Sequence, residues 1–297
     1  MKNKIIYNII YGFAYIHAIL PLRVLYVLSD ILWPLMYYIV RYRRKLVRKN
    51  LNASFPEKTP TEIIRIEKQF YRHFCSYIVE TIKIFHISDQ EMQRRMKFTN
   101  MELLHPYIKE GHSFIVMLGH YGNWEWITSF GLSLPQNLFV SQVYRKLKNK
   151  PFDRLMLKLR TRFGTINIEK NDTLRTIVKL MRSDKQAVIG FISDQKASRN
   201  NIHYWTTFLN QDTSVLTGAE RIARQTGFLV AYMDVKRIKR GYYEAEMKLI
   251  SDNPKSTEEN EITEKYIRMM EQTIMRDPAY WLWTHNRWKF KRNNLPE

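Results

Sequence analysis

The stretch best equipped for chemistry runs from Gly119 to Glu125 and places His120 five residues before Glu125. At that spacing a carboxylate can reach one imidazole nitrogen, fix the tautomer and leave the other nitrogen free as a base. A hydroxyl is a poor nucleophile, and a positioned histidine that removes its proton contributes typically about 10²–10⁴-fold. The pair is thus suited to acyl transfer. A structural loop histidine, with Glu125 only favouring a helix dipole, fits the same spacing.

The flanking residues predict which elements hold this pair. Residues 113–118 form a short apolar run that is typical of a buried strand. Gly119 and Gly122 permit a tight turn, and Asn123 is a good N-cap for a helix that begins at Trp124. His120 would then lie at the carboxyl end of a strand, where ligands bind in open α/β sheets. The free N–H groups of the helix could face a developing oxyanion.

The sequence from His120 to Glu125 resembles the H-x-x-x-x-D/E box of glycerolipid acyltransferases. Its form, with Gly-Asn-Trp-Glu after an apolar strand, is similar to that of the lipid A biosynthesis (late) acyltransferases. The resemblance covers roughly residues 40–292 and includes the segment 48–56, an Asp194-Gln195 block and a W-x-x-x-R ending. It implies the glycerolipid acyltransferase fold, with His120 as the catalytic base and Glu125 as the group that orients it.

Further site residues follow from strand ends and from the same resemblance. Arg145 follows a predicted strand over 137–144, the position that His120 occupies after its own strand. The resemblance implies that arginines in this block bind a phosphate-bearing acceptor or donor, and guanidinium pairs bidentately with phosphate. Asp194 ends another apolar strand, although relatives commonly carry a second acid where this chain has Lys196. The predicted substrate-binding residues are Arg145, Asn123, Asp194, Arg160 and Arg162.

The composition narrows the range of partners. The chain has 297 residues, 45% of them hydrophobic, which argues against disorder. Its net charge of +20 implies a negatively charged partner, such as nucleic acid, anionic lipid or an acidic protein. Cys75 is the only cysteine, so an intrachain disulfide and a cysteine-based zinc site are excluded. No helix-turn-helix, zinc or RNP pattern is present and the cations flank apolar segments, so we expect no nucleic acid partner.

The first forty residues are predicted to form a membrane anchor. The run 5–22 has no charged residue and the run 24–40 has only Asp30, yet neither reaches the roughly 20 residues of an ordinary span cleanly. Tyrosine and tryptophan rings suit the headgroup zone, and six cations follow within 41–49. A re-entrant hairpin or a single tilted span fits this pattern, and a pair of buried core helices is the alternative. Residues 41–297 would form the catalytic domain.

Alternating strands and helices predict an α/β fold with a mostly parallel core sheet flanked by helices. The expected protein is a membrane-bound O-acyltransferase at the cytoplasmic face of a bacterial inner membrane. It would move an acyl chain from acyl carrier protein or acyl-CoA to a lipid hydroxyl, which the resemblance identifies as that of a lipid A precursor. No metal or cofactor is required, because the leaving thiolate is good and the base is supplied.

The donor and the acceptor leave alternatives open. The run 145–162 holds eight Lys or Arg and one acid, and an acidic carrier protein would be drawn to it. The same charge could serve anionic lipid alone. The acceptor could also be a lysophospholipid or an amino-acid lipid. A basic membrane-tethering or nucleic-acid-binding protein without catalysis is the alternative of another class.

Overall fold

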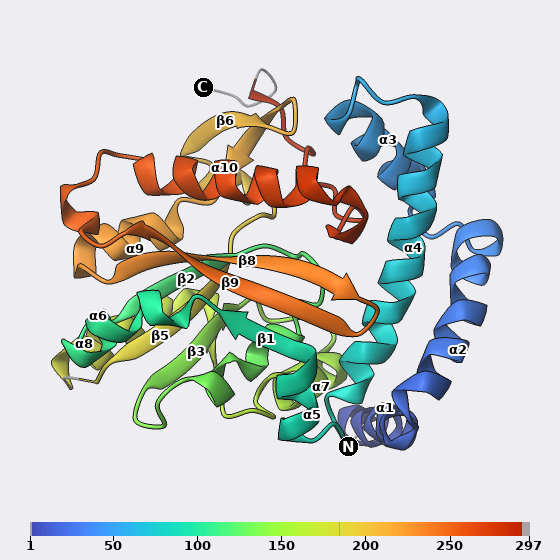
Figure 1. Ribbon diagram of the computed structural model, residues 1–297, viewed down its shortest axis with the longest axis horizontal. Coiled ribbons are helices and arrows are strands. Elements are labelled where there is room, and N and C mark those ends of the chain that lie inside the picture. Colours follow the sequence, from blue (N-terminus) through green and yellow to red (C-terminus); the bar gives the residue numbers. More distant parts are fainter. Residues whose placement is uncertain (1, 184, 293–297) are drawn as a thin grey trace.

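The computed structural model describes residues 2–183 and 185–292 and centres on one seven-stranded sheet (Figure 1). The first residue of the predicted anchor and residues 184 and 293–297 of the predicted catalytic domain lie outside that range. The strand order is β1-β9-β8-β2-β5-β3-β4. The strands of this sheet are β1 (Met96–Thr99), β2 (Phe114–Leu118), β3 (Phe139–Tyr144), β4 (Ile166–Glu169), β5 (Ala187–Ile192), β8 (Leu229–Lys239) and β9 (Tyr242–Ser251).

Five neighbouring strands, β8, β2, β5, β3 and β4, run parallel. β9 is antiparallel to β8, and β1 is parallel to β9, so these two run the other way. The predicted class, α/β with a mostly parallel core sheet flanked by helices, is confirmed. β2 lies between β8 and β5 and is buried along its whole length, which is why its sequence is a continuous apolar run. β6 (Tyr204–Phe208) and β7 (Gln211–Val215) form a separate antiparallel pair.

Ten α-helices lie in the described residues, and they cover the sheet unevenly (Figure 1). Their bounds are α1 (Lys2–Ile19), α2 (Leu22–Pro34), α3 (Arg44–Ser54), α4 (Pro60–Lys83), α5 (Asp89–Arg95), α6 (His105–Lys109), α7 (Lys150–Arg160), α8 (Thr173–Arg182), α9 (Gly218–Thr226) and α10 (Glu261–Arg276). α10 packs on β8 and β9, and α9 packs on β2. α4, which begins with a Thr59/Glu62 capping box, crosses the carboxyl ends of the parallel strands.

The first two helices pack on the rest of the molecule. α2 lies along α4, and α1 lies against α7, where Arg154 covers the Tyr7 ring at 4.1 Å and Lys158 covers the Tyr11 ring at 3.9 Å. The Lys83 Nζ donates to the carbonyls of Ala18 and Leu20 at 2.7 and 2.9 Å, and so caps the end of α1. These contacts join the predicted anchor to the catalytic domain.

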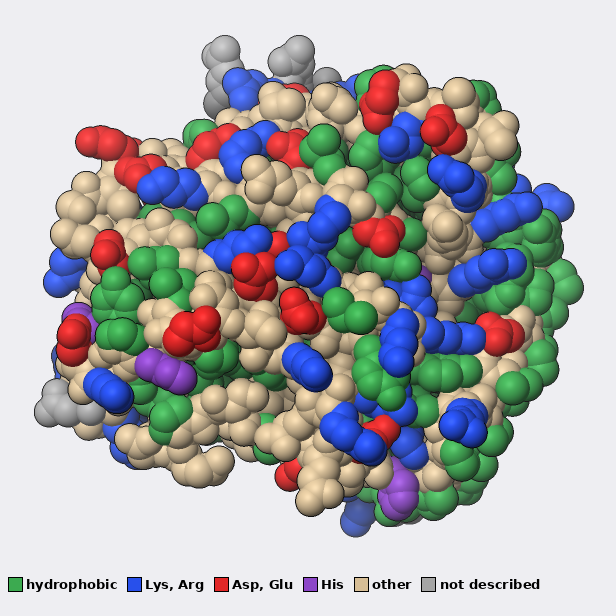
Figure 2. Space-filling model, viewed as in Figure 1, with side chains coloured by type: hydrophobic (Ala, Val, Ile, Leu, Met, Phe, Trp, Pro, Cys, Tyr) green, Lys and Arg blue, Asp and Glu red, His purple; other side chains and the backbone are tan. Residues whose placement is uncertain are grey.

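Both helices nevertheless expose apolar side chains on their outer faces, which Figure 2 shows over α2. The segment Leu22–Ile39, in which α2 continues into a short π-helix, has a mean hydropathy of 1.3 and is 22% buried. It is the one helix within residues 2–183 and 185–292 that is long and apolar enough to cross a membrane. By length and composition alone, a core helix or a signal sequence passes the same test.

Candidate active site

The box lies in a tight loop at the carboxyl end of β2, as predicted. A Cβ at Gly119 would lie 2.4 Å from the end of the Met270 side chain, so a larger residue there would require Met270 to move. Gly122 adopts a left-handed backbone with φ of 61°. The C-terminal tail fixes the loop from the other side: Leu282 N–H donates to the His120 carbonyl at 3.1 Å, and Gly122 N–H donates to the Tyr280 carbonyl at 3.0 Å.

The carboxylate that contacts His120 belongs to Asp194, which follows the end of β5. The His120 Nδ1 lies 2.6 Å from Asp194 Oδ1, and Asp194 Oδ2 accepts from the His120 main-chain N–H at 2.9 Å and from Trp281 Nε1 at 2.7 Å. Burial opposes ionisation of Asp194, but the His120 imidazole and these hydrogen bonds lower the pKa of its carboxyl to about 2. The ionised carboxylate must accept, so Nδ1 carries the proton and Nε2 is free to act as a base.

Glu125 has a different partner, which corrects the expected His120–Glu125 contact. Its carboxylate, only 2% exposed, receives Arg160 Nε at 2.8 Å and Arg160 Nη2 at 2.6 Å. The residues after Asn123 form a turn and then a 3₁₀ helix over Trp126–Ser133, so the chain carries Glu125 toward α7. Burial opposes the charge on Arg160, yet the Glu125 charge and hydrogen bonds raise the pKa of the guanidinium above its usual value.

The proton-accepting side of His120 is partly exposed and lies next to a side-chain amide. The imidazole is 18% exposed, and Gln195 Nε2 lies 3.2 Å from His120 Nε2 as its hydrogen-bond donor. An incoming hydroxyl can replace this neutral amide at little cost. The main-chain N–H groups of Tyr121, Gly122 and Trp126 already donate to protein carbonyls. The predicted use of helix N–H groups for an oxyanion therefore has fewer donors than expected, because a 3₁₀ helix replaces the α-helix.

Cations gather at the same edge of the sheet. Burial lowers the pKa of Lys196, and the positive charges of Lys289, Arg145 and Arg287 lower it further. Arg145 is exposed and lies in this group, as its position after β3 predicted. Arg287 is 2% exposed, and its three guanidinium nitrogens have no hydrogen-bond partner among the described residues. Burial lowers the pKa of Arg287 to about 10, so it stays charged at neutral pH near Asp194.

Three of the predicted substrate-binding residues, Asn123, Arg160 and Arg162, make contacts within the protein. Asn123 is fully buried; its amide donates to Glu80 at 2.8 Å and its Oδ1 accepts from Trp126 N–H at 3.2 Å, which agrees with a capping role. Arg162 donates to the Ile87 carbonyl and pairs with Asp89 at 3.1 Å, in the connection between α4 and α5. Arg160 is held by Glu125. Of the predicted residues, the structure therefore brings His120 and Asp194 together, and the Arg145 charge is close enough to Lys196 to lower its pKa.

Three side chains at the site were missed by reasoning from the sequence: Gln195, Trp281 and Arg287. Each stands in a segment whose resemblance was recognised, either the Asp194-Gln195 block or the tryptophan-rich ending. Their positions in the sequence show no fixed spacing from His120, so the sequence alone does not indicate that they lie close to it. The fold brings them together. His285, beside them, accepts a hydrogen bond from Lys196 N–H at 3.4 Å, and burial lowers the pKa of its imidazole to about 4.

Comparison with known proteins agrees with this geometry. The family profile for bacterial lipid A biosynthesis acyltransferases matches residues 2–290. The chain is 22% identical to the lipid A biosynthesis palmitoleoyltransferase of Escherichia coli over 280 residues, which cover 94% of this chain and 89% of that protein. It is 25% identical to a lipid A biosynthesis acyltransferase of Haemophilus influenzae, over 83% of this chain and 78% of the relative. The lauroyltransferase of Escherichia coli is 22% identical, over 96% and 92%.

The match extends from α1 to the C-terminal tail and so includes the His120 loop, the Asp194 strand end and the tryptophan-rich ending. The similarity therefore extends well beyond the short motif from His120 to Glu125. The protein is an acyltransferase, and it belongs to the bacterial lipid A biosynthesis acyltransferase family.

Proposed function

We propose that this protein transfers a fatty acyl chain from a carrier-bound thioester to a hydroxyl group of a lipid A precursor, at the cytoplasmic face of a bacterial inner membrane. The observation that carries the chemistry is the 2.6 Å contact between His120 Nδ1 and Asp194 Oδ1. The names of the relatives support the acceptor.

In the proposed reaction His120 Nε2 removes the proton of the acceptor hydroxyl while its oxygen attacks the thioester carbonyl. The tetrahedral intermediate then breaks its C–S bond, and the leaving thiolate takes the proton from the imidazolium. The products are the ester and the free carrier thiol, and the base is restored. Asp194 stays ionised throughout, because it is the group that stabilises the imidazolium and holds its Nδ1 proton.

Glu125 acts as a positioning residue in this proposal. Its bidentate pair with Arg160 joins the loop that follows His120 to α7. Trp124, between the two box residues, stacks on Tyr77 of α4 with ring centroids 4.1 Å apart and meets the His120 ring edge-on at 5.2 Å. Loss of the Glu125 charge would leave a largely buried guanidinium unpaired and would disturb the His120 loop through Trp124.

A phosphorylated acceptor fits the cations at this edge. Arg145 and Lys289 are close enough to Lys196 for their charges to lower its pKa, and Arg287 adds a buried positive charge. Guanidinium and ammonium groups bind phosphate oxygens strongly. A lysophospholipid also carries phosphate, and it is the second acceptor to test. The relatives' names favour the lipid A precursor.

For the donor, we propose an acyl carrier protein that contacts the exposed start of the basic run. The later cations of the run are engaged in the protein: Arg154 and Lys158 cover tyrosines of α1, and Arg160 pairs with Glu125. The lysines at 146, 148 and 150 are exposed and follow Arg145 directly. This leaves a short cationic surface at the edge that holds His120, where an acidic carrier would be steered.

The donor proposal is tested by initial rates against salt, with one acyl chain presented on carrier protein or on coenzyme A. Charge reversal at Lys146, Lys148 and Lys150 should raise KM for the carrier alone, and the carrier reaction should lose rate steeply with salt. The matched control reverses Lys179, Arg182 and Lys185, which are exposed in and after α8. Equal KM values and equal salt slopes for both donors would refute a carrier surface.

We propose that α1 and α2 attach the protein to the membrane through their exposed apolar faces. Four of the six cations within 41–49 make contacts within the protein. Arg44 and Arg48 pair with Glu67, while Arg41 donates to the Tyr38 carbonyl and Arg43 to the Thr284 carbonyl. Apolar insertion should therefore dominate over charge, and high salt should fail to extract the protein, whereas detergent should succeed. Clean extraction by salt would refute apolar attachment.

The experiment that tests the function is transfer of a labelled acyl chain by the purified protein to a lipid A precursor and, in parallel, to a lysophospholipid. A product ester on the lipid A precursor, absent with His120→Ala, is the expected result. Lipid analysis of cells with and without the gene provides the matching observation in vivo. Transfer to the lysophospholipid alone would replace the acceptor, and turnover by His120→Ala would refute the base.

A further inference from the structure

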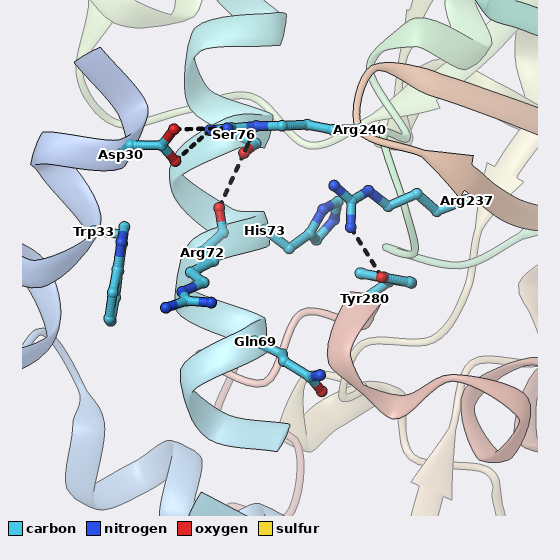
Figure 3. A pocket seen from close by; sticks show the side chains of 9 residues that line it. All are labelled: Asp30, Trp33, Gln69, Arg72, His73, Ser76, Arg237, Arg240 and Tyr280. Carbon is cyan, nitrogen blue, oxygen red and sulfur yellow. Dashed lines mark hydrogen bonds and ion pairs between the residues drawn. The ribbon is translucent and has the colours of Figure 1, made fainter. Parts of the chain in front are cut away.

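A cavity of about 470 Å³ lies between α2, α4, the tip of the β8–β9 hairpin and the segment Pro278–Tyr280 (Figure 3). The reaction proposed above does not use it. Three arginines from two elements line it: Arg72 on α4, and Arg237 and Arg240 at the hairpin. Asp30 on α2 is the one acid among its lining residues. Figure 2 shows Lys and Arg side chains gathered beside α4 and the hairpin tip.

The charges in this cavity do not balance. Arg240 uses the single acid, since its guanidinium pairs with Asp30 at 2.9 Å and also bonds Ser76 and Ser29. Arg237 donates to the Tyr280 hydroxyl at 2.9 Å, and its Nε has no hydrogen-bond partner among the described residues. The acids that interact with its charge, Glu80 and Asp277, do not line the cavity. His73 adds no charge, because burial and the Arg237 charge lower the pKa of its imidazole to about 3. Among the residues that line the cavity, positive charges therefore exceed negative ones by two.

Arg72 is the residue best placed to hold a ligand. Its guanidinium lies 4.5 Å from the centre of the Trp33 ring, which orients the plane and uses none of its N–H donors. Its side chain is exposed at the cavity mouth. A guanidinium that is oriented by stacking, with its donors available, is the arrangement that pairs with the oxygens of a phosphate.

The position of the cavity indicates where such a phosphate comes from. Its Asp30 and Trp33 lie on α2, and the outer face of the same helix exposes an apolar stripe made of Val24, Val27, Leu28 and Ile31. A helix that buries this stripe among acyl chains places residues on its flank at the depth of lipid headgroups. The cavity then opens where headgroup phosphates are concentrated.

We propose that this cavity is a binding site for the phosphate ester of a membrane lipid headgroup, held by Arg72 with the added positive charge of Arg237, and that it is separate from the acyl-transfer site. It adjoins the catalytic loop through two contacts. His73 Nε2 donates to the Gly122 carbonyl at 3.0 Å, and the Tyr280 carbonyl accepts from Gly122 N–H at 3.0 Å. A lipid bound here would thus lie against the side chains that support the His120 loop.

The test uses the full chain and measures its binding to vesicles of phosphatidylcholine that contain either phosphatidate or, at equal surface charge, oleate. Arg72→Ala is the variant, since this side chain is exposed and its loss should leave the fold intact. Arg65→Ala is the matched control, because it removes the same charge two turns away on α4 and outside the cavity. Glycerol 3-phosphate and inorganic phosphate, titrated by calorimetry, test soluble sources.

The wild-type protein should bind phosphatidate vesicles about tenfold more tightly than oleate vesicles, as one charge-assisted contact allows. Arg72→Ala should lose that preference and Arg65→Ala should keep it. His120→Ala should also keep it, so the result does not depend on the acyl-transfer mechanism. Equal binding to both vesicles, or equal losses in both arginine variants, would refute the site. Binding of glycerol 3-phosphate without a vesicle preference would refute the lipid source.

Discussion

His120 and His73 both lie close to Gly122, but their surroundings are opposite. His120 precedes Gly122 in the same loop, and His73 hydrogen-bonds to its carbonyl. His120 contacts an ionised carboxylate through Nδ1 and presents Nε2 to a replaceable amide. His73 is 4% exposed, donates Nε2 to the Gly122 carbonyl and lies near Arg237, and burial lowers its pKa to about 3. One imidazole can take and return a proton, and the other serves as a neutral donor. The group that each imidazole contacts therefore decides whether the histidine can act as a general base or only as a structural hydrogen-bond donor.

Replacement of His120 should have the largest effect on activity. His120→Ala should lower kcat by about 10²–10⁴-fold, because it removes the general base. A loop-end side chain that is 18% exposed contributes little packing, so the melting temperature should stay near that of the wild type. Single-turnover rates and thermal unfolding measure the two effects. A variant with near-normal turnover would make His120 as structural as His73.

Asp194→Asn tests the carboxylate that distinguishes the two rings. An amide at this position removes the charge that stabilises the imidazolium, so kcat should fall by about 10²-fold or more while the lipid KM changes little. Glu125→Gln should behave differently: it leaves Arg160 unpaired and should lower the melting temperature first. The double variant Glu125→Gln, Arg160→Met should recover part of that stability. If Glu125→Gln lowered kcat as much as Asp194→Asn without any loss of stability, Glu125 would be the residue that orients His120.

His73 predicts a dependence of stability on pH. Its pKa is about 3 in the folded protein and about 6.5 when unfolded, so the unfolded state binds more protons between these values. The stabilisation is present above pH 6.5 and is lost as the pH falls toward 3, by about 3 kcal/mol at pH 4.5. Denaturant unfolding at pH 7 and 4.5 should show a smaller loss in His73→Gln. Identical losses would mean that His73 is accessible to protons in the folded state.

The smallest effect is expected at Gln195. Its amide is a neutral donor to His120 Nε2, so Gln195→Ala should change kcat/KM by less than about fivefold. The acceptor hydroxyl replaces this amide as the partner of His120 Nε2, whereas His73 keeps its hydrogen bond to the Gly122 carbonyl throughout the reaction. A loss comparable to that of Asp194→Asn would show instead that Gln195 holds a reacting group.

The sequence predicted the sheet and the position of His120 well, because apolar runs such as 113–118 and 187–192 mark buried parallel strands directly. It missed β1 and β7, which are short and half polar. It also chose Glu125 as the partner of His120 from nearness along the chain. Asp194 lies 74 positions away and reaches His120 only because β2 and β5 are neighbours in the sheet. A site assembled from strand ends is hidden until the strand order is known.

The cap that Lys83 places on α1 has a consequence for engineering. Lys83 donates to the carbonyls of Ala18 and Leu20. On the same helix, α4, Ser76 hydrogen-bonds Ser29 of α2 and Glu80 accepts from the hydroxyl of Tyr26 of α2. The first forty residues therefore cannot be exchanged as a cassette for an unrelated hydrophobic segment. A chimaera would need to carry α4 with them, and the two would have to change together over evolutionary time.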